Sequence, residues 1–206
     1  MTYFPARAVV DLDAIAHNIG VLAALAPDSA VMAVVKADAY GHGLVPVARA
    51  ALAGGATWLG AAQLSEALAL RAAGVGGRLL TWIFAPGAPL GEALATDIDL
   101  SAGAPWALEE ILSAARRSGT VARVHLKVDT GLGRGGSFLP QWTEMLHRAL
   151  EAEAAGEIRL VGVWSHLASA DDVTSPVTVA QLAVFNQAVA LAEAAGAHLE
   201  VRHLAN

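Results

Sequence analysis

Short apolar runs rich in β-branched residues alternate with longer alanine-rich stretches along the whole chain. Seven of the runs have the length and composition of strands, and they cover residues 30–35, 57–62, 78–84, 97–103, 122–131, 159–168 and 199–206. Six stretches have apolar residues at helical spacing, and they cover residues 11–26, 43–55, 64–74, 105–119, 140–154 and 176–196. This alternation predicts a parallel sheet with helical crossovers, the α/β class.

Two architectures follow from this alternation. A (β/α)8 barrel of the TIM type takes about 250 residues, so seven strands in 206 residues would form an incomplete one. A doubly wound open sheet also fits the pattern. Because 55% of the residues are hydrophobic and no low-complexity linker interrupts them, we expect a single domain over residues 1–206.

Helix boundaries are marked by capping residues. Asp11 or Asp13 is expected to cap the first helix, and Gly54 or Gly55 to end the second. Ser65 is expected to cap the third helix. Proline lies near the first turn of the helix from residue 105.

Composition excludes several classes of protein. A net charge of −6 argues against a nucleic-acid partner, because such proteins usually carry a basic face. No uncharged apolar run has the length of a membrane span, so no membrane partner is expected. The first residues lack the pattern of a signal peptide, and cysteine is absent. A cytoplasmic location is therefore expected.

Lysine is rare in this chain. Of 13 basic residues only Lys36 and Lys127 are lysines, and each follows or ends an apolar run. Lysine is therefore not used here to cover the surface, and these two positions need another explanation.

Isolated polar residues follow four of the expected strands. Lys36 follows the first run, and Lys127 and Asp129 follow "RVHL" (123–126) in the fifth. His166 follows "VGVWS" (161–165) and Asn206 follows "VRHLA" (201–205). The carboxyl ends of strands in a parallel α/β sheet form its ligand-binding edge. These positions therefore predict an active site, with no metal expected in it.

Each of these residues also has a structural interpretation. We interpret Lys36 as a desolvated amine whose lowered pKa would make it a nucleophile. The structural alternative is a loop lysine whose aliphatic stem is buried and whose charge is solvated. Lys127 could serve the site or form a structural ion pair, with Asp129 or with an acidic helix end. His166 could be a hydrogen-bonded core histidine. The glycine-rich residues 131–136 resemble a phosphate loop only weakly. The residues alone indicate an α/β enzyme with a reactive lysine and a small anionic substrate or cofactor.

Four segments resemble signatures of one enzyme family. "AVVKADAYGHG" (33–43) resembles the pyridoxal-phosphate lysine motif of alanine racemases, and "HLKVDTGLGRGG" (125–136) resembles their second signature. "SHLASAD" (165–171) and "HLAN" (203–206) match later strand ends in the same order. The resemblance implies an N-terminal α/β barrel that binds pyridoxal 5'-phosphate, followed in the family by a β-rich domain. It also implies a homodimer.

The resemblance implies a role for each matching residue. Lys36 would form the aldimine with pyridoxal phosphate and act as one acid/base group, and Tyr40 would help hold the phosphate. Trp82 would line the cofactor pocket. Arg134 would hold the substrate carboxylate near the phenolic oxygen of the cofactor.

Three further residues are implied to complete the site. Lys127 matches a lysine that is often carbamylated in the family and that positions the arginine; a carbamate would be an anionic partner for Arg134. His166 would pack along the pyridine ring, and Asn206 would lie beside the phosphate loop.

The implied activity is interconversion of L- and D-alanine by two-base proton transfer, which supplies D-alanine for peptidoglycan. The family's second base is a tyrosine beyond the "HLAN" segment, so we expect the polypeptide ending at Asn206 to be a fragment that racemises poorly. Two alternatives remain open. One is a racemase for serine or another small amino acid, and the other is a non-catalytic, single-domain pyridoxal-phosphate-binding barrel.

Overall fold

The computed structural model describes residues 6–204. The chain divides after Thr81 into two compact units, and each is described here by itself. Strand β3 (Arg78–Ile83) spans the division, so its last two residues open the second unit.

Unit 1 holds the first three strands and four helices. Its elements in chain order are α1 (Leu12–Leu25), β1 (Met32–Val34), α2 (Lys36–Gly41), α3 (Leu44–Ala53), β2 (Trp58–Gln63), α4 (Leu64–Ala72) and most of β3. Strand β1 pairs in parallel with β2, with Ala33 opposite Leu59. Helices α1 and α3 pack against each other, and α3 and α4 both contact β2.

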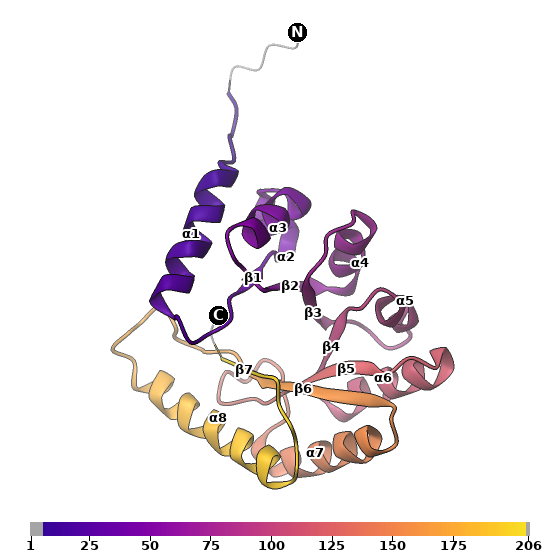
Figure 1. Ribbon diagram of the computed structural model, residues 1–206. Coiled ribbons are helices and arrows are strands. Elements are labelled where there is room, and N and C mark those ends of the chain that lie inside the picture. Colours follow the sequence, from indigo (N-terminus) through magenta and orange to yellow (C-terminus); the bar gives the residue numbers. More distant parts are fainter. Residues whose placement is uncertain (1–5, 205–206) are drawn as a thin grey trace. The chain divides into compact units, whose positions relative to one another are not determined.

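Unit 2 continues the same alternation. Its elements are α5 (Leu90–Ala95), β4 (Asp99–Ala102), α6 (Pro105–Ser118), β5 (Ala122–Lys127), α7 (Leu139–Ala154), β6 (Ile158–Trp164), α8 (Pro176–Ala194) and β7 (Val201–His203). Strands β4 to β7 are parallel and follow in chain order. Helices α6, α7 and α8 lie in sequence along one side of these strands (Figure 1). A bulge between Val124 and His125 shifts the register of β5 against β6.

The seven expected strands are all present, and the crossover helices begin near their expected residues. Asp11 caps α1 by accepting a hydrogen bond from the amide of Ala14 at 3.0 Å, and Gly54 ends α3. The expected cap at Ser65 is wrong. The N-cap of helix α4 lies two residues earlier, at Gln63, and Gln63 and Glu66 form a reciprocal capping box there.

Two short elements were not expected from the sequence. Helix α5 has six residues between a proline- and glycine-rich loop and a threonine, too few for a periodic signal. The segment α2 has backbone angles of the opposite hand from an ordinary helix. It follows β1 directly and carries Lys36.

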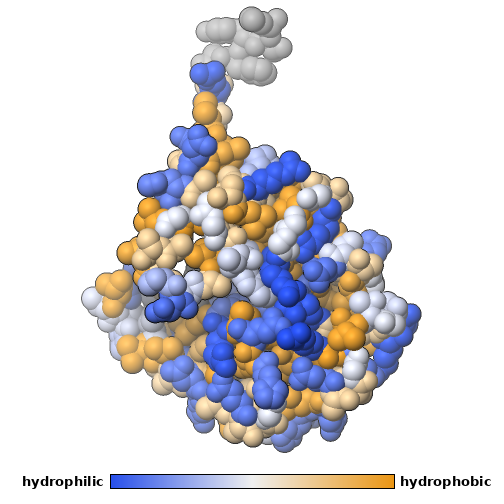
Figure 2. Space-filling view, in the orientation of Figure 1, coloured by the Kyte–Doolittle hydropathy of each residue, from blue (hydrophilic) through white to orange (hydrophobic). Residues whose placement is uncertain are grey.

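Helix α8 qualifies the expectation about membranes. It has 19 residues and a mean hydropathy of 1.3, so by length and composition alone it could cross a membrane. One face of α8 packs into unit 2, where Gln181, Phe185 and Ala188 are buried. Figure 2 shows hydrophobic and hydrophilic residues interspersed over the visible face. The helix therefore has the packing of a crossover helix.

Candidate active site

Lys36 lies at the carboxyl end of β1, where the sequence places it. Val35 before it is buried, and its amide donates to the carbonyl of Gly60 on β2 at 2.8 Å. The Lys36 side chain is half-buried, and its Nζ atom lies 5.7 Å from the centre of the Tyr40 ring. Tyr40 is 73% exposed. An amine and a phenol are therefore held together at this strand end.

The backbone after Lys36 forms a left-handed turn. Ala37, Asp38, Ala39 and Tyr40 have φ between 52° and 55° and ψ between 40° and 51°. None of the four is glycine, and the left-handed conformation costs about 1–2 kcal/mol for each such residue. Strain of this kind persists only where surrounding contacts fix the conformation, and it is concentrated at functional sites.

Two carboxylates hold this turn. Glu66 of α4 accepts the amide of Ala37 at 2.5 Å, and its other oxygen accepts the amide of Gln63 at 3.0 Å. Asp38 accepts the amide of Leu44 at the start of α3 at 2.6 Å. The turn is thus fastened to the first turns of two helices, and the direction in which Lys36 leaves the strand is fixed by backbone contacts.

In unit 2, Lys127 ends β5 and lies over an aromatic ring. Its Nζ atom is 4.6 Å from the centre of the Trp164 ring at the end of β6. Burial lowers the pKa of the Lys127 ammonium, the nearby Arg134 guanidinium lowers it further, and the Asp129 carboxylate partly offsets both effects. This lysine is therefore partly desolvated in a ring-lined position.

The loop after β5 is organised by Asp129. Its Oδ1 atom accepts the amides of Gly131 at 2.8 Å and Gly133 at 3.2 Å. No Lys127–Asp129 ion pair forms within the described part of the chain. Arg134 is exposed in the loop after β5, and its guanidinium lies near enough to lower the pKa of Lys127. The expected role of Arg134 beside Lys127 stays a prediction.

Trp164 is the centre of an aromatic cluster, defined here as Trp82, Trp164, His166 and His203. Trp82 meets Trp164 edge-on at 5.8 Å, and His166 meets it at 5.0 Å. His203 stacks on Trp164 at 5.3 Å with an interplanar angle of 9°. The indole Nε1 donates to Ser101 of β4 at 2.7 Å. The predicted residues Trp82 and His166 therefore share one buried tryptophan as their neighbour.

Charged and polar side chains lie beneath this cluster. Arg123 of β5 donates to Asp99 of β4 at 3.0 Å and to Glu200 at 2.8 Å. These hydrogen bonds raise the pKa of Arg123 despite its partial burial. His125 lies between Asp99 and His203, at 3.2 Å and 3.1 Å.

Sequence reasoning did not identify Trp164, His203, His125 or Asp99. One signal was present. Arg123, His125 and Lys127 are spaced by two along a strand, so their side chains point to the same face. Asn206, the last predicted site residue, lies outside the described residues. No group of three or more His, Asp or Glu side chains in residues 6–204 could hold a metal ion.

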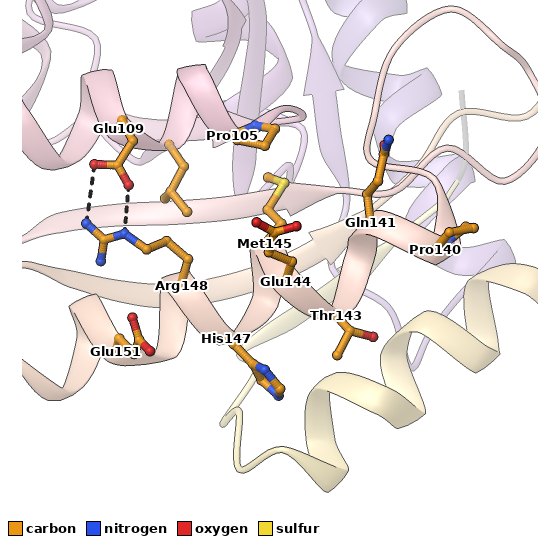
Figure 3. Close-up of a pocket in the computed structure, with 11 residues that line it drawn as sticks. Pro105, Glu109, Pro140, Gln141, Thr143, Glu144, Met145, His147, Arg148 and Glu151 are labelled. Carbon is orange, nitrogen blue, oxygen red and sulfur yellow. Dashed lines mark hydrogen bonds and ion pairs between the residues drawn. The ribbon is translucent and has the colours of Figure 1, made fainter.

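A separate cleft lies on the outer side of unit 2 between α6 and α7. It has a volume of about 850 Å³ and is lined by Pro105, Leu108, Met145 and acidic side chains (Figure 3). The Arg148–Glu109 ion pair, at 2.7 Å, bridges the two helices along it. None of the predicted site residues lines this cleft, and it is explained by the groove between two packed helices.

Comparison with known protein families identifies a match over nearly the whole chain. Residues 10–206 match the family model described as "Alanine racemase, N-terminal domain". The chain is 69% identical over 206 residues to the alanine racemase of Beutenbergia cavernae, covering 100% of this chain and 54% of that protein. It is 53% identical over 201 residues to that of Thermobifida fusca, covering 98% and 54%. The chain thus spans about half the length of these relatives.

Solved structures agree with these matches. The alanine racemase from D-cycloserine-producing Streptomyces lavendulae superposes with a TM-score of 0.94 at 51% identity, covering 96% of this chain and 52% of that one. The alanine racemase of Corynebacterium glutamicum gives 0.85 at 37% identity, covering 95% and 55%. Together with the seven strands observed, this likeness confirms the α/β barrel class, with about seven strands present.

Proposed function

This chain belongs to the alanine racemase N-terminal domain family, and we propose that the complete protein is an alanine racemase in which this chain binds pyridoxal 5'-phosphate through Lys36. The observation that carries the proposal is the position of Lys36, at the carboxyl end of β1 on a turn held in a strained conformation. The complete protein would interconvert L- and D-alanine in the cytoplasm as a homodimer, and would supply D-alanine for peptidoglycan.

The residues present fit this cofactor. Lys36 offers an amine for its aldehyde, and Tyr40 offers a hydroxyl for its phosphate. Trp82 and His166 offer flat ring faces, and the exposed Arg134 offers a guanidinium for a carboxylate. Asn206 is proposed to lie beside the phosphate. When bound, pyridoxal phosphate supplies the electron sink that makes the α-proton of an amino acid removable.

The chain's own residues then have defined tasks. Lys36 would take or return the α-proton on one face of the substrate, since the residue is half-buried and the direction of its side chain is fixed by the turn. Arg134 would orient the substrate carboxylate. Lys127 would act as a positioning residue for Arg134, directly or as a carbamate. The second proton carrier would come from the part of the complete protein that follows this chain.

The assignment of Lys36 as the lysine that binds pyridoxal phosphate can be tested by chemical trapping. The complete protein with added pyridoxal phosphate is reduced with borohydride, digested and mapped by mass spectrometry. The adduct is expected on the peptide that contains Lys36. Lys127 is the internal control, because it is the only other lysine in the chain. An adduct confined to Lys127 would overturn the assignment.

Activity and substrate need a separate assay. The complete protein is expected to interconvert D- and L-alanine faster than D- and L-serine, and residues 1–206 alone are expected to do so poorly. Preference for serine would favour a racemase of different specificity. Cofactor binding with no α-proton exchange from either amino acid would favour a non-catalytic cofactor-binding barrel.

A further inference from the structure

A line of three hydrogen-bonding groups crosses unit 2 from β4 to β7. Asp99 Oδ2 lies 3.2 Å from His125 Nε2, and His125 Nδ1 lies 3.1 Å from His203 Nε2. His125 is 0% exposed and Asp99 is 1% exposed. None of the three has a role in the function proposed above, and we refer to them as the Asp99–His125–His203 relay.

The Asp99 end of the relay can only accept hydrogen bonds. Arg123 Nε donates to both carboxylate oxygens of Asp99, at 3.0 Å and 3.2 Å. A carboxylate beside a guanidinium is an acceptor. His125 must therefore carry a proton on Nε2 to bond with it.

The proton on His125 Nε2 determines the rest of the relay. Burial lowers the pKa of His125, and burial together with the neighbouring histidines lowers the pKa of His203 to about 3. A neutral imidazole has one N–H, so His125 Nδ1 is an acceptor and His203 Nε2 is its donor. The single proton of His203 is thereby placed on Nε2, and its Nδ1 atom has a free lone pair for accepting.

Packing holds both rings in these orientations. An added Cβ at Gly162 on β6 would lie 2.9 Å from His125 Nδ1, so the strand leaves this ring no space to move toward it. His203 is stacked on Trp164, which is itself anchored to Ser101. Because neither ring is free to turn, the atoms that donate and accept in the relay are fixed.

We propose that Asp99 and His125 are positioning residues that hold His203 as its Nε2–H tautomer, so that Nδ1 of His203 is a hydrogen-bond acceptor at the carboxyl end of β7. The inference rests on the proposed function in one respect: His203 stacks on Trp164, which also contacts His166, the residue proposed to pack along the cofactor. The group that binds beside His203 Nδ1 in the working protein is then a donor, an N–H or an O–H.

Nuclear magnetic resonance can report the tautomers directly. The complete protein is labelled with ¹⁵N-histidine, and long-range ¹⁵N–¹H correlations are recorded at neutral pH, with assignments from the variants His125→Gln and His203→Gln. Both rings are expected to be neutral with the proton on Nε2. A His203 ring that is doubly protonated, or protonated on Nδ1, would overturn the proposal.

The substitution Asp99→Asn should reverse the relay. Asparagine keeps the shape, its oxygen can still accept from Arg123, and its NH₂ would now donate to His125 Nε2. His125 would then carry its proton on Nδ1, and the proton of His203 would move to its own Nδ1. Glu200→Gln is the matched control, because Glu200 also binds Arg123 and also acts electrostatically on His125, whereas the carboxylate oxygen that faces His125 Nε2 belongs to Asp99. An unchanged His203 tautomer in Asp99→Asn would show that Asp99 does not control it.

Activity supplies a second readout that depends on the proposed function. Loss of the outer hydrogen-bond partner of a metal-binding histidine typically lowers activity about 10–100-fold. By analogy we expect a fall in kcat of this size for Asp99→Asn and little change for Glu200→Gln. Reversed tautomers with unchanged kcat would overturn the link between the relay and catalysis. Because the tautomers are measured without substrate, a protein that does not racemise alanine would refute the proposed function and leave the tautomer test decisive.

Discussion

The two lysines of this chain are held by different means. Lys36 stands on a left-handed turn whose conformation is fixed by backbone hydrogen bonds, and its nearest ring, that of Tyr40, is largely exposed. Lys127 ends a buried strand and lies against Trp164, a ring packed by other rings. A strained backbone can fix where a side chain begins while leaving its end free to reach a ligand. Close packing fixes the side chain itself, as a positioning group requires.

Replacing each lysine is the strongest test of this difference. Lys36→Arg should lower the racemase activity of the complete protein by about 10²–10⁴-fold, because arginine cannot act as the amine or release a proton at neutral pH. Lys127→Arg should lower it by about 10–100-fold, as expected for a supporting residue. Initial rates of alanine interconversion check both. Equal losses would mean that the two lysines do not have the separate roles proposed here.

Removing the carboxylate that holds the turn should be the next largest effect. Glu66→Ala removes the acceptor for the amides of Ala37 and Gln63, and the free energy of unfolding should fall by about 1.5–3 kcal/mol. Urea unfolding measures the change. The neighbouring substitution Ser65→Ala is the control, because Ser65 is exposed and does not cap the helix. A comparable loss at Ser65 would contradict the capping assignment.

Lowering the pH should lower the free energy of unfolding, because His203 is held neutral in the folded protein. The pKa of His203 is about 3 in the folded protein and about 6.5 as its ordinary value, so between these values the unfolded chain binds the proton and the folded chain does not. Stability is therefore full above pH 6.5 and falls with decreasing pH by up to about 1.4 kcal/mol per unit, or about 2 kcal/mol at pH 5. Unfolding at pH 7 and pH 5 tests this.

His203→Gln is the control for the acid effect. Glutamine can still donate to His125 Nδ1 but does not titrate, so the variant should lose this part of the pH dependence. Any slope from His125, whose pKa is also lowered by burial, would remain. A variant with the full slope of the native protein would show that another group is responsible.

The smallest expected effect is a stabilisation. Ala39→Gly relieves a positive φ of 52°, and the unfolding free energy should rise by about 0.5–1 kcal/mol after the entropy of glycine is subtracted. The same change at Ala69, an exposed position inside α4, should lower it by about 1 kcal/mol. Changes of opposite sign in the unfolding free energy at these two positions would show that the turn is strained and that α4 is not. Destabilisation at both positions would mean that the turn is not strained.

The sequence was sufficient for the strands because their apolar runs are separated by well-marked helices, and each strand end could be read from the first polar residue after it. It was also sufficient to place Lys36, Lys127 and His166 at strand ends, and their roles in a site stay predictions. The Ser65 cap failed because glutamine, a weak capping residue by itself, is supported by Glu66 three residues later.

The remaining features depend on contacts that local patterns do not contain. The left-handed turn has no glycine among its four strained residues, and it is held by Glu66, 29 residues away from Ala37. The relay joins residues 26 and 78 positions apart in the chain. Neither the contact from Glu66 to the turn nor the contacts of the relay can be derived from composition or periodicity.

Synthesis on the ribosome proceeds from the N-terminus, and this gives the anchoring of the Lys36 turn a consequence for the order of folding. Val35 needs the carbonyl of Gly60, and Ala37 needs the carboxylate of Glu66. A nascent chain that has emerged only as far as residue 59 has neither contact, so its lysine segment has no reason to adopt a left-handed backbone. The Lys36 side chain therefore acquires its orientation only after the start of α4 has left the exit tunnel.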